Sequence, residues 1–385
     1  MRPVSSWVPV AALLSAITTI SQAVKLPLPV KLVHQFPTPT YLNSLYVRPN
    51  GDIYVTTVWP DASIYSVSGA NTDAPTGSLV HTFDEINVVT SITEAEPGVL
   101  VFLGGNQSSI GVGVFGTFGV YEIDLRPQAK GGKASIRYAV PMPDAGLMTG
   151  IQALPASPST VLVSDSLLGL VYKVDTMTGK YEVAIKDEAS MGHPSWTVTP
   201  FGINNLRIHN GYLYWTNSYV ATVYRVAITK DGYAVPGSKI ELVKRLQTIY
   251  LDSICLGPGE SDTIWGATNA DNRLVAITPD GNATFVAGSP TEMTIAGSVA
   301  PGFGTLPGDT ETLYVATGGS LLFPVNGTII EGGKIVAVNT TGFGADESKP
   351  REKAQKAQPS VTICPQTTSW VDYLWQLPLK HLSLL

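Results

Sequence analysis

The chain has 385 residues, of which 44% are hydrophobic and 14% are charged, and its formal net charge is -6 at pH 7. A chain of this length and composition can bury a large core as one domain or as one closed repeat array. The negative charge and the lack of lysine and arginine clusters argue against nucleic acid as a partner. We expect the partner to be a small, apolar molecule.

The N-terminal segment predicts entry into the secretory pathway. Arg2 precedes an apolar run at residues 7–20, and the small residues at 21–23 form a cleavage pattern. We therefore expect residues 1–23 to be a signal peptide and the mature protein to be secreted. The apolar run is too short and too rich in Ser and Thr for a membrane span, and no later stretch offers about twenty consecutive apolar residues.

The cysteines and the glycosylation sequons also bear on the compartment and on the source of stability. Only two cysteines occur, Cys255 and Cys364, so no disulfide framework is expected and stability must come from a buried core. Four acceptor sequons agree with the secretory route and predict N-linked glycosylation at Asn106, Asn282, Asn326 and Asn339.

The body of the chain repeats one pattern of short strands and turns. In residues 200–227, "GINNLRI" alternates as a strand, "HNG" is a turn, and "YLYWTNS" and "ATVYRVA" are two further strands. Six copies, spaced by roughly 45–60 residues, are typical of radial β-repeats. The pattern predicts an all-β, six-bladed β-propeller over residues 24–343. Its copies begin at Leu42, Thr90, Thr149, Pro200, Leu251 and Ala296.

The ends of the repeat predict how the ring closes. The strand-like segment "VKLVHQF" at residues 30–36 precedes the first copy, and "GGKIVAVN" at residues 332–339 follows the last. We expect the N-terminal strand to complete the last blade, because closure hides edges that would otherwise promote aggregation. Residues 344–385 leave the pattern and are predicted to be a charged linker and a loosely packed tail.

A mouth at one face of this propeller is the predicted site. The innermost strand of each blade begins at that face and the second strand ends there, so residues from all six blades converge on it. We assign a catalytic hydrogen-bonding role to Asp252, Asn217 and Asn43. Substrate binding is assigned to Trp59, Thr149, Asp165, His193, Phe201 and Asn269.

These assignments compete with structural roles. A buried Asp252 can accept backbone N–H groups between blades, and asparagines at strand ends are common in turns. Trp59 is the preferred aromatic contact because its large amphipathic ring sits in a turn. The long insertion "EASMGHPSWTVTPFG" is the predicted lid over the mouth, and it carries His193, Trp196 and Phe201.

Several segments of the chain resemble the gluconolactonase and regucalcin-like propellers, and more closely a fungal secreted branch of them. They are "TYLNSLYVRPNG" in the first repeat, "VSDSLLGLVYKVD" in the third, "PFGINNLRIHNGYLYWTN" in the fourth and "GATNADNRLVAITPDG" in the fifth. The resemblance extends from about residue 32 to residue 342 and implies a six-bladed propeller.

For lactone-hydrolysing members, the resemblance implies a divalent metal held by a Glu of the first blade, Asn residues of the third and fourth, and an Asp of the fifth. In this chain Asn43 stands in the Glu position, Thr149 or Thr90 in one Asn position and Phe201 in the other; Asp252 alone matches. A hard divalent cation needs more oxygen ligands than this set supplies. We therefore expect no metal and no other cofactor.

The fungal branch includes the hetero-Diels-Alderases of tropolonic sesquiterpenoid biosynthesis. Resemblance to them implies a metal-free site that joins a tropolone quinone methide to an alkene of a macrocyclic terpene alcohol. Such a site needs no nucleophile, only two partners held in one orientation and hydrogen-bond donors on an oxygen that gains charge. This is the preferred function. The alternatives are a metal-dependent lactone hydrolase and a secreted propeller that only binds a ligand.

Overall fold

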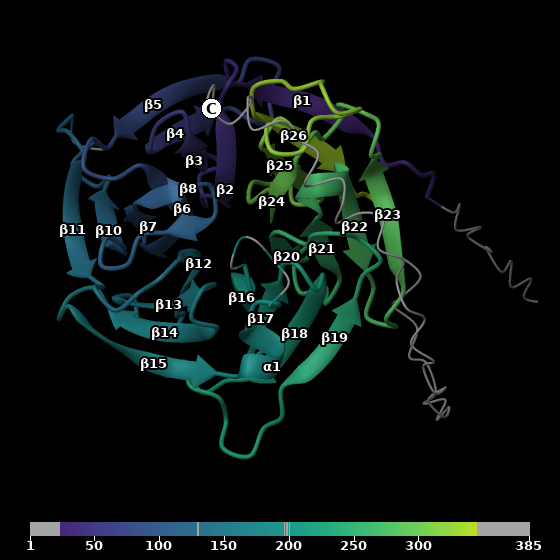
Figure 1. The fold of residues 1–385 in the computed structure, drawn as a ribbon. Helices are drawn as coiled ribbons and strands as arrows, with labels where there is room; N and C mark the ends of the chain where they lie inside the picture. Colours follow the sequence, from purple (N-terminus) through teal and green to yellow (C-terminus); the bar gives the residue numbers. More distant parts are fainter. Residues whose placement is uncertain (1–23, 129–130, 196, 198, 200, 345–385) are drawn as a thin grey trace, which may run out of the picture.

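The computed structural model describes residues 24–344, except residues 129–130, 196, 198 and 200. Within these residues the chain forms six four-stranded antiparallel sheets, arranged as blades around a central axis (Figure 1). The predicted all-β, six-bladed propeller is thus confirmed. The predicted signal peptide, and the C-terminal segment from residue 345 onward, lie outside the described residues.

The two inner strands of every blade surround the axis. The innermost strands are β2 (Tyr41–Val47), β6 (Val88–Glu96), β12 (Met148–Ala153), β16 (Ile203–His209), β20 (Ile254–Leu256) and β24 (Ser298–Phe303). The second strands are β3 (Ile53–Trp59), β7 (Val99–Gly105), β13 (Thr160–Asp165), β17 (Tyr212–Asn217), β21 (Ile264–Ala267) and β25 (Thr312–Thr317).

The two outer strands of every blade form the rim in Figure 1. The third strands are β4 (Ser63–Ser68), β10 (Gly119–Asp124), β14 (Leu170–Asp175), β18 (Thr222–Ala227), β22 (Arg273–Ile277) and β26 (Lys334–Asn339). The outermost strands are β5 (Thr76–Thr82), β11 (Ser135–Pro141), β15 (Lys180–Lys186), β19 (Glu241–Arg245), β23 (Ala283–Gly288) and β1 (Val30–Gln35).

The ring is closed by the N-terminal strand. β1 pairs antiparallel with β26, from Val30 opposite Val338 to Gln35 opposite Lys334, and completes the sheet of β24, β25 and β26. The predicted pairing is therefore confirmed. The register shifts between Leu32 and His34, so Val33 lies in a bulge, where its side chain is buried in the main hydrophobic cluster.

Local sequence explains the hairpins within the blades. In blade four, β16 and β17 meet at Asn210 and Gly211, whose φ angles are 47° and 78°. Asn and Gly are the residues that best tolerate this left-handed geometry, which the tightest hairpin turns require. The strands themselves are rich in β-branched and aromatic residues, and Trp215 of β17 and Trp265 of β21 are almost completely buried.

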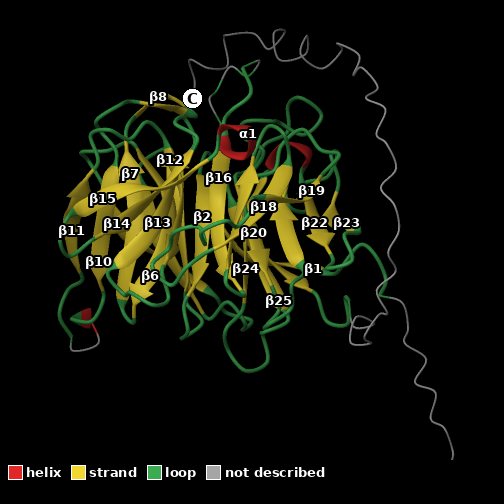
Figure 2. Ribbon diagram, turned by 90° about the horizontal axis from the view of Figure 1, so that it is seen from below, coloured by secondary structure: helices red, strands yellow, loops and turns green. Residues whose placement is uncertain are grey.

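Short elements in the described part of the chain lie between the strands of the blades. Two of them, the strands β8 (Gln107–Ser109) and β9 (Val112–Gly113), form a hairpin, and α1 (Glu188–Met191) begins the long insertion. The hairpin and α1 lie at the same end of the propeller in Figure 2. A 3-10 turn, η2 (Asn269–Asp271), follows β21. No helix among the described residues is long and apolar enough to cross a membrane.

Closure by β1 predicts a difference between two neighbouring residues. Val33 is 8% exposed and Leu32 is 52% exposed. Val33→Asp should lower the free energy of unfolding by about 3 kcal/mol, because it buries a charge without a partner. Leu32→Asp, the matched control, should change it by less than about 0.5 kcal/mol. Denaturant unfolding of both variants measures this, and equal losses would mean that docking of β1 does not depend on Val33.

Candidate active site

One end of the axis collects the residues that the sequence predicted as a mouth. The strand registers place the start of each inner strand opposite the end of the second strand, as in the pairs Tyr41 with Trp59, Met148 with Asp165 and Ile203 with Asn217. We call this end the mouth face. The hairpin β8–β9 and α1 also lie there (Figure 2).

A hydrogen-bonded cluster around Asp252 occupies the mouth face near the axis. The Asp252 carboxyl is buried, and it accepts hydrogen bonds from Nδ2 of Asn204 at 3.1 Å and Nδ2 of Asn269 at 2.8 Å. Asn269 Nδ2 also donates to Oη of Tyr41 at 2.8 Å. The cluster therefore joins inner strands or loops of blades one, four and five.

Burial controls the protonation of this cluster. Removal from water raises the pKa of Asp252 to about 7, although the hydrogen bonds from Asn269, Asn204 and Ser253 oppose that shift because they favour the ionised form. The pKa of Tyr41 is also raised, first by its own burial and then by the nearby Asp252. Near neutral pH the Asp252 carboxyl is thus partly protonated, and in that form it is a hydrogen-bond donor.

Asn204 was not singled out from the sequence. It is one of two consecutive asparagines at the start of β16, and the register of this strand shifts between Ile203 and Leu206. Because of that irregularity, Asn204 contacts Asp252 while Oδ1 of Asn205 accepts the backbone N–H of Ile254. The signal in the sequence was the pair "NN" itself, but the alternation of a regular strand does not tell which asparagine faces the axis.

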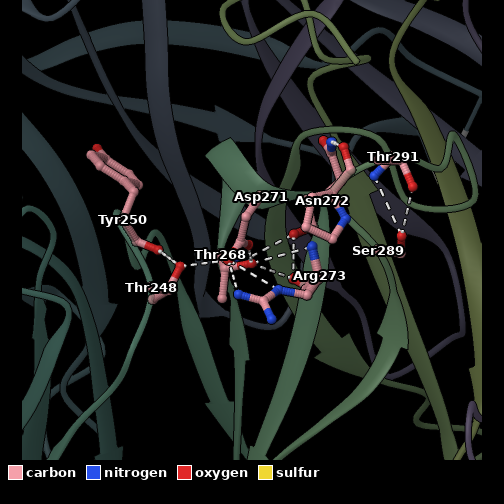
Figure 3. A network of polar contacts seen from close by, with 10 residues as sticks. Thr248, Tyr250, Thr268, Asp271, Asn272, Arg273, Ser289 and Thr291 are labelled. Carbon is pink, nitrogen blue, oxygen red and sulfur yellow. Dashed lines mark hydrogen bonds and ion pairs between the residues drawn. The ribbon is translucent and has the colours of Figure 1, made fainter. Parts of the chain in front are cut away.

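A polar network around Thr268, Asp271 and Arg273 fixes the turn that follows β21 (Figure 3), and Asn269 is the first residue of this turn. Asp271 accepts hydrogen bonds from Oγ1 of Thr248 at 2.7 Å, from Nε of Arg273 at 3.0 Å and from the hydroxyl of Thr268. Asn269 itself has a left-handed φ of 48°. The network holds this unusual backbone, so that the Asn269 amide reaches both Asp252 and Tyr41.

Three aromatic rings, those of Phe201, Tyr219 and Tyr250, pack together at the mouth face. The ring centroids of Phe201 and Tyr250 are 6.1 Å apart, and those of Tyr219 and Tyr250 are 5.2 Å apart, both in edge-to-face arrangements. Thr199 also hydrogen-bonds to the hydroxyl of Tyr219. Tyr250 lies close enough to Asp252 for the two groups to affect each other electrostatically. Tyr250 therefore links this group of aromatic rings to the Asp252 cluster.

The hairpin β8–β9 packs over part of the mouth face. Its tip residue, Gly111, has a φ of 81° and lies so close to Phe201 that a β-carbon would overlap the phenyl ring. At its other end, Gly113 packs in the same way against the carbonyl oxygen of Gly146. The hairpin starts in blade two and Phe201 precedes blade four, so this contact spans two non-adjacent blades.

Two predicted mouth residues leave a polar atom unpaired. Trp59 is half-buried, and its Nε1 is buried without a hydrogen-bond partner among the described residues. Asn217 donates from Nδ2 to the carbonyl oxygens of Ser190 at 3.1 Å and Gly192 at 2.9 Å, which anchors the α1 segment. The Oδ1 atom of Asn217 is buried and has no hydrogen-bond partner among the described residues. Unpaired buried atoms of this kind are rare and call for an explanation.

Comparison with known proteins identifies the family. No family model matches the chain. A Sarocladium schorii protein named as a hetero-Diels-Alderase, asR5, is 31% identical over 347 residues, covering 82% of this chain and 85% of that protein. A Phoma sp. protein, also named as a hetero-Diels-Alderase, is 32% identical over 322 residues, covering 78% and 89%. The chain belongs to the hetero-Diels-Alderase family. The resemblance seen in the sequence is confirmed, and so is the assignment as an enzyme.

Solved structures of other proteins share the propeller fold of this chain. A regucalcin from Agrobacterium tumefaciens, described as a calcium-binding protein, superposes with a TM-score of 0.55 at 13% identity, covering 83% of this chain and 96% of that one. A luciferin-regenerating enzyme gives a TM-score of 0.56 at 14% identity, covering 82% and 96%. At these identities the comparison supports the propeller architecture alone.

Other residues that the sequence predicted for the site of this hetero-Diels-Alderase family member make hydrogen bonds that stabilise its backbone. The Asp165 carboxylate is fully buried and accepts four backbone N–H groups, from Gly146, Leu147, Leu167 and Leu168. Such an acceptor has little capacity left for a substrate.

Asn43, Thr149 and His193 also have partners within the chain. Nδ2 of Asn43 donates to the Thr90 carbonyl oxygen at 2.6 Å, which links the first two blades. The Thr149 hydroxyl hydrogen-bonds to Ser166 Oγ at 3.1 Å. His193 lies half-buried in the insertion after α1, where Nδ1 is 3.4 Å from the carbonyl oxygen of Pro194. Trp196, expected on the same lid, lies outside the described residues.

The sequons differ in their exposure. Asn282, Asn326 and Asn339 are exposed. Asn106 is half-buried at the mouth face, where its Oδ1 accepts the backbone N–H of Asn87 at 2.9 Å.

The donor set near Asp252 is poor for a divalent metal. The described residues contain no group of three His, Cys, Asp or Glu side chains close enough to hold one. The Asn204 and Asn269 amides present Nδ2, a donor, to the carboxyl of Asp252. Hard cations need several carboxylate or carbonyl oxygens directed at one point, and this arrangement does not direct them so.

The raised pKa predicts a pH-dependent stability. The folded protein binds a proton at Asp252 more tightly than the unfolded chain, whose aspartates titrate near 4. Its unfolding free energy should therefore fall as pH rises from about 4 to about 7, by at most about 1.4 kcal/mol per pH unit from this group. Asp252→Asn cannot titrate, so the melting temperature of the variant minus that of wild type should increase over this range.

Asp231→Asn is the matched control for that measurement, because Asp231 is exposed on a loop of blade four. Its melting temperature should follow wild type across the whole pH series. A constant difference between Asp252→Asn and wild type at every pH would contradict the shifted titration.

Proposed function

We propose that this protein catalyses an intermolecular hetero-Diels-Alder reaction in the biosynthesis of a secondary metabolite. Its heterodiene is a tropolone quinone methide, and its partner is an alkene of a macrocyclic terpene alcohol. The observation that carries the proposal is family membership: two relatives named as hetero-Diels-Alderases match about four-fifths of the chain, a span that must include most of the blades. The fungal branch that the sequence resembles supplies the substrate class.

The chemistry makes modest demands on side chains. Two π bonds are consumed, one C–C bond and one C–O bond form, and no group leaves. Holding both partners in one reactive orientation can remove a large part of the entropic barrier. The carbonyl oxygen of the quinone methide gains negative charge as the C–C bond forms, so a hydrogen-bond donor placed on it lowers the barrier further.

The mouth face offers suitable donors and surfaces. The protonated form of Asp252 can donate a hydrogen bond, in the way that buried neutral carboxylic acids do in other sites. Trp59 Nε1 is a buried donor that a substrate oxygen would satisfy. The rings of Phe201, Tyr219 and Tyr250 provide an apolar wall against which planar substrates can pack.

Product stereochemistry tests the proposal. Wild type should convert the two precursors faster than they react alone and should give one stereoisomer where the uncatalysed reaction gives a mixture. Asp252→Ala should slow turnover by roughly ten- to a hundredfold, the size expected for one lost donor in the transition state. Trp59→Phe keeps an aromatic ring without the N–H and should cost about tenfold. Chiral chromatography measures rate and isomer ratio together.

Two controls sharpen the test. Asp231→Asn should behave as wild type. Asp252→Asn keeps a donor that does not ionise, so its rate should stay flat above pH 7, where that of wild type declines. If wild type leaves both the rate and the isomer ratio at the uncatalysed values, the proposed reaction is wrong.

A metal-dependent lactone hydrolase remains a second candidate because of one specific observation. Asn204 and Asp252 lie in blades four and five, the blades that supply an amide and a carboxylate ligand in the lactone-hydrolysing propellers that the sequence resembles. Against it stand the single carboxylate and the orientation of the amides.

Chelation separates the two candidates. For the proposed reaction, EDTA should leave turnover unchanged, and calcium should not raise the melting temperature. A ligand that binds only the folded state stabilises it by mass action, so a calcium-dependent increase in melting temperature, together with lactone hydrolysis lost in EDTA, would favour the hydrolase.

We also infer that the chain passes through the secretory pathway. The N-terminal pattern at residues 1–23 supports this route. Asn282, Asn326 and Asn339 are exposed and so accessible to glycosylation.

A further inference from the structure

A cavity of about 210 Å³ lies on the axis, away from the mouth face. Each blade contributes to its wall through the later part of its innermost strand. We call it the axial cavity. Each blade contributes one polar or small residue to this wall. In blade order these residues are Tyr46, Thr93, Gln152, Arg207, Cys255 and Gly302. The mouth cluster around Asp252 lies where these same strands begin, so the two sites occupy different levels of one axis.

Arg207 enters this cavity without a carboxylate partner. Its Nη1 donates to the carbonyl oxygen of Leu206 at 2.7 Å, and no ion pair joins its guanidinium to any acidic side chain in the described part of the chain. Of the acidic residues near the cavity, Glu94 is already paired with Arg48 at 2.8 Å. A guanidinium has five N–H donors, so most of those of Arg207 remain available.

The groups closest to Arg207 do not neutralise it. Burial raises the pKa of Cys255 to about 12, and burial together with the charge of Glu94 raises the pKa of Tyr46 to about 12. Both groups are therefore neutral at physiological pH. Burial lowers the pKa of Arg207, but an arginine remains charged in proteins. Arg207, which is half-buried, is thus left as a positive charge without a carboxylate partner in the axial cavity, and partial removal from water makes such a charge costly.

The remaining wall selects among anions. Ile92, Ile151 and Phe303 bring hydrocarbon surface to the same cavity. A ligand that satisfies both parts of the wall carries one negative charge on a planar, two-oxygen group and has a short apolar chain. A carboxylate matches the fork of the guanidinium with two parallel hydrogen bonds. Inorganic phosphate carries more charge and has no apolar part, so it would leave the hydrocarbon wall without a partner.

We propose that the axial cavity is a binding site for a short-chain organic monocarboxylate, held by Arg207 through a two-point ion pair. Thr93 and Gln152 lie in the same wall and offer a hydroxyl and an amide to the carboxylate. The site does not depend on the reaction proposed for the mouth face, because none of its residues belongs to the Asp252 cluster.

Thermal unfolding and calorimetry of the full protein test this site with sodium butyrate as the probe. At constant ionic strength, butyrate should raise the melting temperature of wild type progressively with concentration. Isothermal titration should give one site per chain. Butyramide has the same chain without the charge and should not bind, which tests the role of charge in wild type itself. Inorganic phosphate should give no saturable shift.

The variant Arg207→Met removes the charge and keeps most of the side-chain length. Its affinity for butyrate should be lower by about ten- to a hundredfold, the value of charged hydrogen bonds. Its melting temperature without butyrate should equal or exceed that of wild type, because a half-buried charge without a carboxylate partner is gone. Arg245→Met, at an exposed arginine of β19, is the matched control and should bind butyrate as wild type does.

Three results would overturn the proposal. Wild type does not bind butyrate, or it binds butyramide or phosphate as well as butyrate, or Arg207→Met binds butyrate with the affinity of wild type. The wild-type comparison of butyrate with butyramide decides the matter even if the variant does not fold. Turnover at the mouth face is measured separately, so failure of the proposed cycloaddition leaves this test intact.

Discussion

Backbone hydrogen bonding between β1 and β26 is the interaction on which the rest of the structure depends. It joins the first residues of the propeller to the last, so that six separate sheets become one ring. A propeller has no covalent closure, and an open ring would expose the unpaired edge of β26 to other chains. The single described cysteine, Cys255, is free, so this pairing and the apolar packing between blades carry the closure.

Closure also creates the chemistry along the axis. Six innermost strands converge there, and they bring polar side chains into surroundings with little water. At one level the result is a carboxyl, Asp252, whose pKa rises to about 7 because burial disfavours its charge. At another level it is a guanidinium, Arg207, which keeps its charge. The convergence of the six strands thus places a carboxyl that titrates near neutral pH and a permanently charged guanidinium on the same axis.

The polar residues of the mouth face differ in whether they stabilise the fold or can contact a substrate. Asp165 accepts four backbone N–H groups, and its hydrogen-bonding capacity is consumed by the loops around it. Asp252 accepts its hydrogen bonds from side chains, the amides of Asn204 and Asn269 and the hydroxyl of Ser253, and side chains can reorient more easily than backbone. Two aspartates at the same face therefore differ in what they can offer, and this difference comes from their neighbours.

By itself, the sequence determined the strand pattern, the number of blades and the pairing of residues 30–36 with residues 334–338, because alternation with period two and turn residues such as Asn210–Gly211 are local signals. It also indicated the family, through motifs spread over most of the chain. Signals of this kind can be recognised in one segment of the sequence without knowing which blades lie beside it.

Only the tertiary structure decided which side chains meet. The irregular register of β16 turns Asn204 toward Asp252 and Asn205 away from it, and a strict alternation does not predict such a shift. The contact of Gly111 with Phe201 joins loops from non-adjacent blades, and Arg207 gains its significance only because five other strands enclose it without a carboxylate. Burial and partner choice are properties of the closed ring, and no single segment of the chain encodes them.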